Sequence, residues 1–246
     1  MCTVSWRLLP AGYDVYFNRD EKRVRQPATP PVIDTRDGVR FVAPRDGNSG
    51  GTWLAVNAWG VTVGLLNHHP DPAPPEPARR RSRGLLLLDL ITADRAAAVV
   101  ARLGQIALGE HAPFTCVAWG ISEPVQAVAW DGRELKPHVR PVAMPLSSSS
   151  FHSAEVIAKR MRVFAAMQEG QDDTDDAGWM EAFHRSHVPE KGPFSVCMHR
   201  TDARTVSFSR VRVTADAAQF FYHAGSPCGD AVDATVELPL AGMRAS

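Results

Sequence analysis

Short runs of apolar, aromatic and branched residues recur along the chain between turn-forming residues, and they predict β-strands. The first two runs, residues 4–9 and 13–18, flank the turn segment Pro10-Ala11-Gly12. They predict an antiparallel hairpin that returns residues 18–21 to the level of residue 2. Further strands are predicted at residues 39–43, 52–57, 61–67, 114–119, 125–130, 139–144, 194–198, 205–213 and 219–223.

Helical spacing of apolar residues predicts helices at residues 93–108, 154–167 and 177–187. Thr92 and Ser153 precede the first two helices and can serve as N-caps. Strands followed by a helix and more strands favour an α+β fold over repeated βαβ units. The length suits a single domain spanning residues 1–246.

Two segments are expected to stay outside the regular structure. Pro27, Pro30 and Pro31 predict a stiff loop that cannot join a central strand. The tail after Cys228 is expected to be irregular.

Charge excludes some classes of partner. Among 246 residues, 27 basic side chains balance 27 acidic ones, so neither nucleic acid nor an anionic membrane is indicated as a partner. No run of 18 apolar residues occurs and the start lacks a secretory signal, which predicts a cytoplasmic protein without a membrane span. The oligomeric state stays open.

Metal ligands do not stand at recognisable spacings in the sequence. The four cysteines, Cys2, Cys116, Cys197 and Cys228, form no CxxC or Cys/His motif, and Cys116 and Cys197 are expected to be small buried hydrophobes. His184 and His187 lie three apart on a predicted helix without a nearby cysteine or third ligand. We therefore expect no metal and no cofactor.

Cys2 is the candidate nucleophile. If Met1 is removed, Cys2 carries a thiol and a free α-amine on one residue. An α-amine titrates at about 7.7–8.0, close enough to ambient pH to accept and return a proton. Such a residue needs no histidine as its base.

The predicted hairpin brings charged residues to Cys2. Arg19 would lie near the thiol, where a positive charge favours the thiolate. Either Asp20 or Glu21 could orient the amine. Arg19 and Glu21 share one face of a regular strand and Asp20 points to the other, which leaves the choice of carboxylate open.

Several spaced motifs resemble one known family. They are Met1-Cys2-Thr3, Asn18-Arg19-Asp20-Glu21, Ala43-Pro44-Arg45-Asp46, Gly50-Gly51-Thr52-Trp53 and Asn57. Together they resemble the NRDE family, also called the transport and Golgi organisation 2 family, which is grouped with N-terminal nucleophile (Ntn) hydrolases. Choloylglycine hydrolases and penicillin V acylases are more distantly similar.

The resemblance implies a fold and further site residues. The fold would be a four-layer αββα sandwich of two antiparallel sheets. Asn67 would help to form the oxyanion hole, Ser148 stands where relatives carry an asparagine that serves the reacting carbonyl, and Asn57 is a candidate supporting residue. Arg200, or equally Arg204, would correspond to a supporting arginine late in the fold.

Two functions follow as hypotheses. The first is an N-terminal cysteine hydrolase acting on a non-peptide amide or related acyl compound, with a small-molecule substrate. The second is a non-catalytic protein that binds or traffics a lipid, haem or acyl ligand on the same scaffold, a hypothesis that Ser148 favours. The proline- and arginine-rich segment at residues 68–83 is expected to be a solvated, mobile connector. The alternative is a lid or substrate-entry loop whose arginines bring in anionic ligands.

Overall fold

The computed structural model describes residues 2–76, 79–138, 142–169, 171 and 178–241. It contains two sheets in which every pairing is antiparallel. The first sheet has the order β10 (Leu146–Ser148), β1 (Cys2–Leu9), β2 (Gly12–Lys22), β11 (Ala203–Val213), β12 (Ala217–His223), β13 (Asp233–Pro239). The second has the order β3 (Thr29–Arg36), β4 (Val39–Arg45), β5 (Leu54–Asn57), β6 (Thr62–Asn67), β7 (Phe114–Trp119), β8 (Gln126–Trp130), β9 (Leu135–Pro137).

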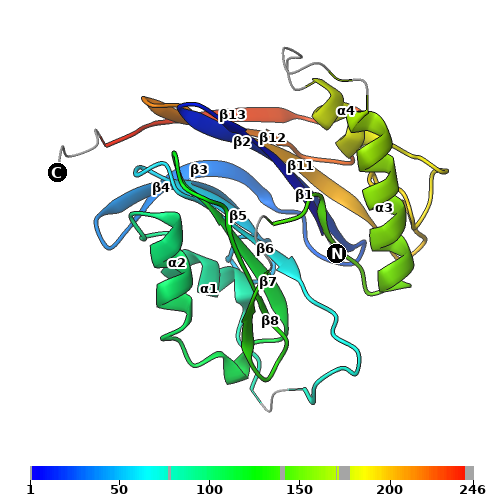
Figure 1. Ribbon diagram of the computed structural model, residues 1–246, viewed down its shortest axis with the longest axis horizontal. Helices are drawn as coiled ribbons and strands as arrows, with labels where there is room; N and C mark the ends of the chain where they lie inside the picture. Colours follow the sequence, from blue (N-terminus) through cyan, green and yellow to red (C-terminus); the bar gives the residue numbers. More distant parts are fainter. Residues whose placement is uncertain (1, 77–78, 139–141, 170, 172–177, 242–246) are drawn as a thin grey trace.

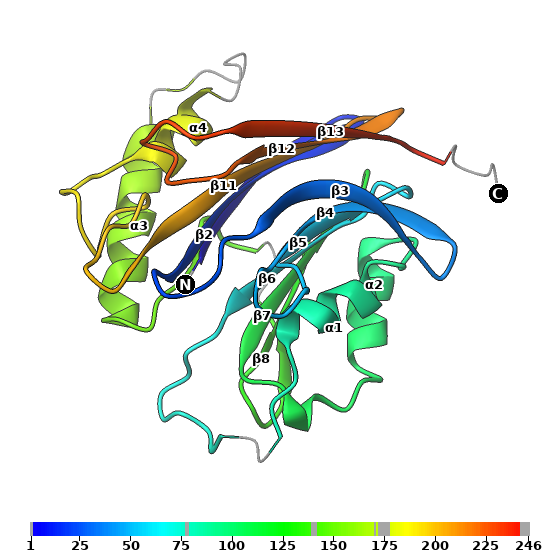
Figure 2. The ribbon, with the colours of Figure 1, turned by 180° about the vertical axis from the view of Figure 1, so that it is seen from behind.

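Helices cover the outer face of each sheet, as Figures 1 and 2 show from opposite sides. Helices α1 (Arg83–Leu90) and α2 (Ala96–Leu103) pack on the second sheet, and the short 3-10 helix η1 (Leu108–Glu110) follows them. Helices α3 (Ser153–Gln168) and α4 (Gly178–Arg185) pack on the first sheet. The two sheets face each other across a third apolar core. The predicted α+β fold with four αββα layers is confirmed.

The core between the sheets follows from alternation along β1 and β2. Val4 and Trp6 point toward the second sheet, and Trp6 meets Trp119 edge to face with ring centroids 5.6 Å apart. Thr3 and Ser5, which alternate with Val4 and Trp6, point toward the helices instead. Burying one face of each strand on the partner sheet fixes the strand register, because a slip by one residue would exchange the two faces.

Prolines did not prevent a strand at residues 29–36. The sequence analysis placed Pro30 and Pro31 in a loop, but both lie in β3. This strand is at the edge of its sheet, where a missing N–H breaks no ladder on the open side, and the pairing with β4 shifts its register between Thr29 and Val32.

Other boundaries also differ from the predictions. The tail after Cys228 forms β13, with Asp233, Thr235 and Glu237 exposed, so its apolar signal is weak. Residues 195–198 are buried and Phe194 is half-buried, but the segment forms no strand. The first predicted helix extends only over α2, and Arg95 rather than Thr92 is its N-cap. Ser153 is the first residue of α3 rather than its cap.

Part of the predicted strand at residues 139–144 lies outside the described residues, and residues 142–144 are not in a strand. Among the described residues, no helix combines the length and the apolar character required to cross a bilayer.

Candidate active site around Cys2

The first hairpin places Cys2 opposite Arg19, as predicted. In the antiparallel pairing of β1 with β2, these two residues are direct partners, and the pairing continues to Leu9 opposite Gly12. Paired residues on adjacent antiparallel strands project their side chains to the same face. Cys2 and Arg19 both line one cavity of about 490 Å³, and both are buried.

The Arg19 guanidinium is held from several sides. Its centre lies 4.0 Å from the centroid of the Trp53 ring, and one of its nitrogens is 3.7 Å from the Glu21 carboxylate. It also donates a short hydrogen bond to Asp46. The predicted sharing of a face by Arg19 and Glu21 is confirmed, and Asp46 and Glu21 balance much of the positive charge beside the thiol.

Asp46 accepts hydrogen bonds from several side chains and backbone groups, although the sequence indicated no role for it beyond its place in a motif. Arg25 donates to both carboxylate oxygens, at 2.7 and 2.8 Å, and Ser49 donates through its backbone N–H and its hydroxyl, both at 2.9 Å. Burial opposes ionisation, but the hydrogen bonds from Arg25 and Ser49 and the charge of Arg19 hold the pKa of Asp46 well below its usual range. The cavity lining therefore includes a carboxylate that stays ionised at neutral pH.

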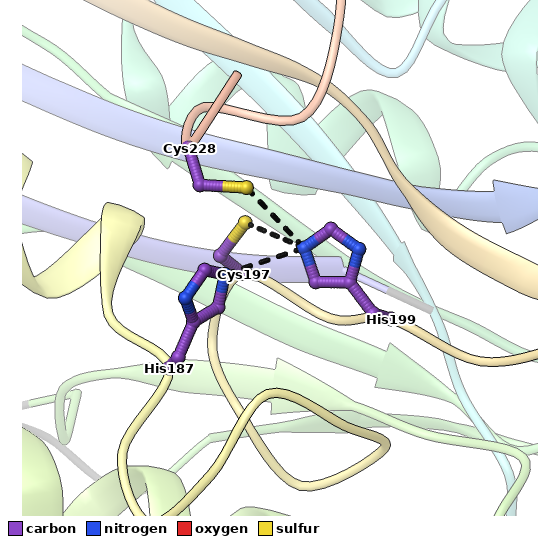
Figure 3. A group of neighbouring side chains, drawn as sticks. All are labelled: His187, Cys197, His199 and Cys228. Carbon is purple, nitrogen blue, oxygen red and sulfur yellow. Dashed lines mark hydrogen bonds between the residues drawn. The ribbon is translucent and has the colours of Figure 1, made fainter.

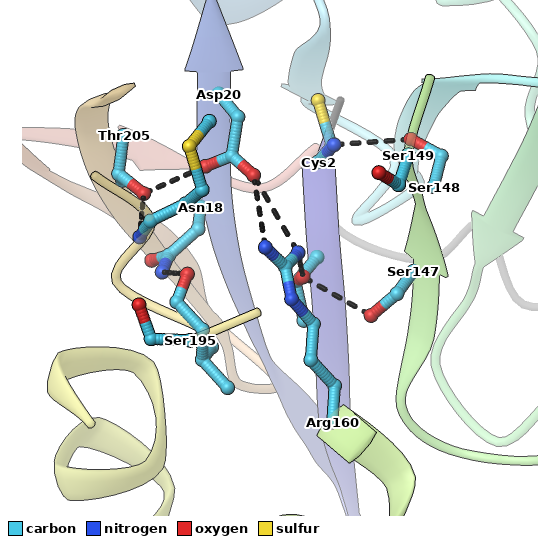
Figure 4. A network of polar contacts seen from close by, with 12 residues as sticks. Cys2, Asn18, Asp20, Ser147, Ser148, Ser149, Arg160, Ser195 and Thr205 are labelled. Carbon is cyan, nitrogen blue, oxygen red and sulfur yellow. Dashed lines mark hydrogen bonds and ion pairs between the residues drawn. The ribbon is translucent and has the colours of Figure 1, made fainter. Parts of the chain in front are cut away.

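Asp20 points to the opposite face of β2, toward the helices. Its carboxylate accepts a hydrogen bond from Thr205 Oγ1 at 2.6 Å and lies 3.5 Å from the guanidinium of Arg160, which also donates to Thr3 Oγ1 at 2.6 Å. Figure 4 shows this network beside Cys2 at the end of β1. Arg160 was missed, although the sequence contains a signal for it: Val156, Arg160 and Phe164 recur every fourth residue on the buried face of α3.

The nitrogen of Cys2 has a defined neighbour. Ser148 Oγ accepts a hydrogen bond from Cys2 N at 3.0 Å, because the short strand β10 pairs with β1 and sets Ser148 opposite Cys2. The Ser148 hydroxyl therefore lies next to the nitrogen of Cys2 (Figure 4). The resemblance predicts that Ser148 stands in place of an asparagine that serves the reacting carbonyl, and the residues alone predict a loop before the helix; the contact with Cys2 N was not predicted.

The environment of the thiol does not favour its ionisation. Burial raises the pKa of the Cys2 thiol, and the negative charge of Asp20 adds to this, while the positive charge of Arg19 opposes it. A resting thiol is expected, which must lose its proton when it reacts.

Asn67 and the arginine-rich loop border the same cavity. Asn67 ends β6 and lines the cavity together with Cys2. The described part of the loop at residues 68–83 contributes Arg80, Arg81 and Arg83. Neighbouring residues of this loop, among them His68 and His69, border an adjacent cavity of about 470 Å³, and burial lowers the pKa of His69 to about 4.

Asn57 and Arg200 are placed away from the Cys2 cavity. The Asn57 amide donates to the carbonyls of Ile91 and Ala93 at 2.6 and 2.7 Å, and its oxygen accepts from two backbone N–H groups at 2.9 and 3.0 Å. Arg200 forms two hydrogen bonds with Asp202, at 2.9 and 2.8 Å, and borders the adjacent cavity. Arg204 is exposed on β11, opposite Glu21 in the register. Asn57 thus holds a turn to the end of α1.

Residues 1–202 match the family model described as Transport and Golgi organisation 2. The chain belongs to this family. No curated protein sequence matches it.

Solved structures similar to this Transport and Golgi organisation 2 family member include proteins named as an amidase, a hydrolase and an acylase. The N-acylethanolamine-hydrolyzing acid amidase ortholog of Caenorhabditis elegans matches with a TM-score of 0.60 and 12% identity, over 85% of this chain and 92% of that one. A mutant of conjugated bile acid hydrolase from Clostridium perfringens matches with a TM-score of 0.57 and 10% identity, over 97% and 92%. Penicillin V acylase from Agrobacterium tumefaciens matches with a TM-score of 0.55 and 10% identity, over 96% and 86%. At these identities the likeness establishes the Ntn-hydrolase type of fold.

Proposed function

We propose that this protein is an N-terminal cysteine hydrolase that cleaves a non-peptide amide or a related acyl compound, with Cys2 as nucleophile after removal of Met1. The observation that carries the proposal is the position of Cys2. It is the second residue of the chain, it lines a cavity of about 490 Å³, and Arg19 is its direct strand partner. A thiol in the interior without a cavity would support no such reaction.

The α-amine of the mature chain would act as the general base. During attack, Cys2 Sγ bonds to the carbonyl carbon while its proton passes to the amine. Collapse of the tetrahedral intermediate breaks the C–N bond and returns that proton to the leaving amine. In the second half of the reaction, the α-amine of Cys2 takes a proton from water as the water oxygen attacks the thioester carbonyl. The C–S bond then breaks, the acid is released, and the α-amine returns the proton to the Cys2 sulfur.

Neighbouring residues have distinct roles in this scheme. Ser148 accepts a hydrogen bond from the nitrogen of Cys2 and would orient the amine. Of the two carboxylates, we propose Asp20 as the partner of the protonated amine, because its charge acts on Cys2 whereas Glu21 pairs with Arg19 and Arg25. The Asn67 amide would donate to the developing oxyanion from the cavity wall.

Charge in the cavity favours an anionic substrate. Arginines outnumber carboxylates among its lining residues, which include Arg19, Arg25, Arg80, Arg81, Arg83, Asp20, Glu21 and Asp46. Arg83 is half-buried and donates to the Pro113 carbonyl at 2.7 Å, with no carboxylate partner among the described residues. We propose that it binds a carboxylate or phosphate of the substrate.

Mass spectrometry of the native protein tests the proposal. We expect an intact mass without Met1 and selective labelling of Cys2 by a cysteine-directed electrophile. The unlabelled protein is assayed against a panel of N-acylethanolamines, conjugated bile acids and penicillin V. Labelling of Cys2 should abolish whichever of these hydrolytic activities the unlabelled protein shows. Retained Met1, or a Cys2 that stays unlabelled while other thiols react, would contradict the mechanism. The variant Cys2→Ala should lose the same activity. Its matched control is Cys116→Ala, which removes a thiol from the apolar core outside the cavity and should keep the activity.

A second candidate is a non-catalytic protein that binds a lipid, haem or acyl ligand in the same cavity. It is favoured by the burial that raises the pKa of the Cys2 thiol and by the serine at position 148. Under this function, Cys2→Ala retains full ligand affinity and complements loss of the gene. Loss of function in that variant, with folding unchanged, would exclude it.

A further inference from the structure

Four side chains with metal-binding atoms meet at a place outside the Cys2 cavity. They are His187, Cys197, His199 and Cys228, and their ligand atoms all lie within 4.8 Å of one another. They come from three segments: the chain after α4, the buried segment before β11, and the loop between β12 and β13. Figure 3 shows all four pointing toward a common centre. The expectation that His187 has no nearby cysteine or third ligand is wrong, because the spacing along the chain does not reveal which distant residues meet.

The distances from His199 Nε2 to the other three ligand atoms match the edges of a tetrahedron around a metal ion, and the remaining distances do not exceed 4.8 Å. With Zn–N of about 2.05 Å and Zn–S of about 2.3 Å, tetrahedral ligands lie about 3.3 Å apart for N to N and about 3.6 Å apart for N to S. His187 Nε2 and His199 Nε2 are 3.3 Å apart. The Cys197 and Cys228 sulfurs lie 3.5 and 3.3 Å from His199 Nε2.

Hydrogen bonding does not explain the arrangement. His199 Nε2 has three close polar neighbours, namely His187 Nε2 and both sulfurs. An imidazole nitrogen has a single N–H or a single lone pair, so it can satisfy only one of these contacts well. A cation at the centre would bind all four atoms at once.

The ligands are also held in place by the backbone around them. Cys197 N donates to the Ser186 carbonyl at 3.0 Å, next to His187, and His199 N donates to Gly192 O at 3.1 Å. The Cys228 loop is anchored through Ser226 Oγ, which donates to Thr205 O at 2.6 Å. Cys197 is buried and Cys228 is exposed, so an ion has a route of entry from solvent.

We propose that His187, Cys197, His199 and Cys228 form a four-coordinate zinc site. Two thiolates and two imidazoles in a tetrahedron are a donor set of structural zinc sites, and harder cations such as Mg²⁺ and Ca²⁺ prefer oxygen ligands. The site does not depend on the proposed hydrolase activity. Cys228 lies beyond the residues that match the family model, so membership of the family does not imply the site.

The zinc site would stabilise the segment that contacts Asp20 beside the candidate active site. Met198, between two of the ligands, donates through its backbone N–H to Thr205 Oγ1 at 2.8 Å, and Thr205 in turn donates to Asp20 at 2.6 Å. With four protein ligands no coordination position is left for a substrate. The ion therefore has a structural role, linking the loop after β12 to the segment that positions Asp20.

Metal analysis of the full-length protein tests the site. The protein carries an affinity tag without histidine, is kept in a non-thiol reductant, and is dialysed after incubation with one equivalent of Zn²⁺. We expect one zinc per chain by elemental analysis. Substitution with Co²⁺ should give the visible absorption of a tetrahedral site with a thiolate charge-transfer band in the near ultraviolet.

Variants distinguish ligands from bystanders. Loss of an outer-shell partner alone often weakens metal binding 10–100-fold, so Cys228→Ser and His199→Gln are expected to weaken zinc affinity by about 100-fold or more. Cys116→Ala removes a thiol outside the site and should bind as the wild type does. Because Cys228 is exposed, Cys228→Ser should fold, and its cobalt spectrum reports on the site directly.

Chelation should destabilise the region around the site. Free zinc at about a thousand times its Kd stabilises the folded protein by mass action. Removing the zinc with a chelator should therefore lower the Tm of a protein of this size by about 8–16 °C. Hydrogen exchange should increase in residues 186–205 and 224–229 and stay unchanged in β4–β8. The proposal is overturned by less than about 0.1 zinc per chain in the wild type, by wild-type affinity in both ligand variants, or by a Cys197–Cys228 disulfide that forms under these reducing conditions and excludes metal.

Discussion

Asp20 and Arg160 form an ion pair from which water is excluded. Their closest atoms are 3.5 Å apart, and the side chains are 0% and 1% exposed. Both charges need compensation in such a place, since an unpaired buried charge is far costlier than an unpaired charge in water. The pair connects the strand that carries the Asn-Arg-Asp-Glu motif to helix α3.

Removing one partner of this pair should be strongly destabilising. We expect Arg160→Met to lower the free energy of unfolding by about 3–5 kcal/mol, because Asp20 is left buried with its charge uncompensated. Arg162→Met, an exposed position on the same helix, should change it by less than about 0.5 kcal/mol. Urea denaturation of both variants measures the difference. Equal effects would show that the charge at position 160 is not what matters.

The charge of Asp20 should also control the reactivity of Cys2. It contributes to the raised pKa of the Cys2 thiol, so Asp20→Asn should lower that pKa and speed alkylation of Cys2 at neutral pH. The measurement is the rate of Cys2 modification against pH, followed by peptide mass spectrometry. Cys116, whose pKa burial raises to about 12, serves as an internal reference that should stay unmodified. An unchanged pH profile would argue against electrostatic coupling between the two residues.

Asp46 should make the protein sensitive to acid. Its pKa is lower in the folded than in the unfolded chain, where a value of about 3.9 is expected. Ionised Asp46 therefore stabilises the fold above that pH, and this stabilisation is lost as the pH falls from about 5 toward the folded-state pKa. Asp46→Asn should flatten the decline of unfolding free energy in urea titrations between pH 5 and 3. Asp89→Asn, in an exposed pair with Arg36, should cost less than about 1 kcal/mol throughout.

Asn57 and Asn67 should respond in opposite ways to the same substitution. Asn57→Ala leaves two carbonyls and two N–H groups without their partner, which should cost about 2–4 kcal/mol of stability with activity per folded molecule unchanged. Asn67→Ala should alter stability little and reduce kcat on the identified amide by about 10²–10³-fold. Thermal unfolding combined with steady-state kinetics separates the two. A large loss of kcat in folded Asn57→Ala would contradict its structural role.

Arg83 should select anionic substrates. Arg83→Gln is expected to raise KM or Kd for a carboxylate-bearing ligand by about tenfold or more, with little change for a neutral analogue of the same size. The difference in KM or Kd for the charged ligand between the wild type and the variant should decrease with added salt. Arg79→Gln, an exposed position of the same loop, is the control and should leave both ligands unaffected. Equal losses for charged and neutral ligands would point to distortion of the loop instead.

The pattern of apolar and turn-forming residues near the start of the chain was sufficient to predict the first hairpin and the residues that pair across it. The apolar stretches around Pro10-Ala11-Gly12 determine the turn, and the turn determines that Cys2 pairs with Arg19. Strand alternation then predicted correctly that Arg19 and Glu21 share a face. Each of these depends on neighbours within about twenty residues, so chain geometry alone decides them.

Contacts between distant segments could not be read in the same way. Arg160 lies beneath Asp20 because α3 packs on the sheet, Ser148 meets the nitrogen of Cys2 because β10 pairs with β1, and the exposed strand β13 forms because β12 offers it an edge. Spacing places Arg160 on the buried face of α3, but neither spacing nor composition indicates which distant residues these three elements contact. Their side chains are also consistent with a surface helix, a serine loop or an irregular tail.

The sequence by itself determined the nucleophile candidate, the α+β class and the strand that delivers Arg19, because periodicity and turn chemistry act over short distances along the chain. Only the tertiary structure decided which buried charges compensate one another, and that His187, Cys197, His199 and Cys228 meet at one point. Those outcomes depend on how whole layers pack, and packing brings together residues up to 41 positions apart in the metal cluster and 140 apart in the ion pair of Asp20 with Arg160.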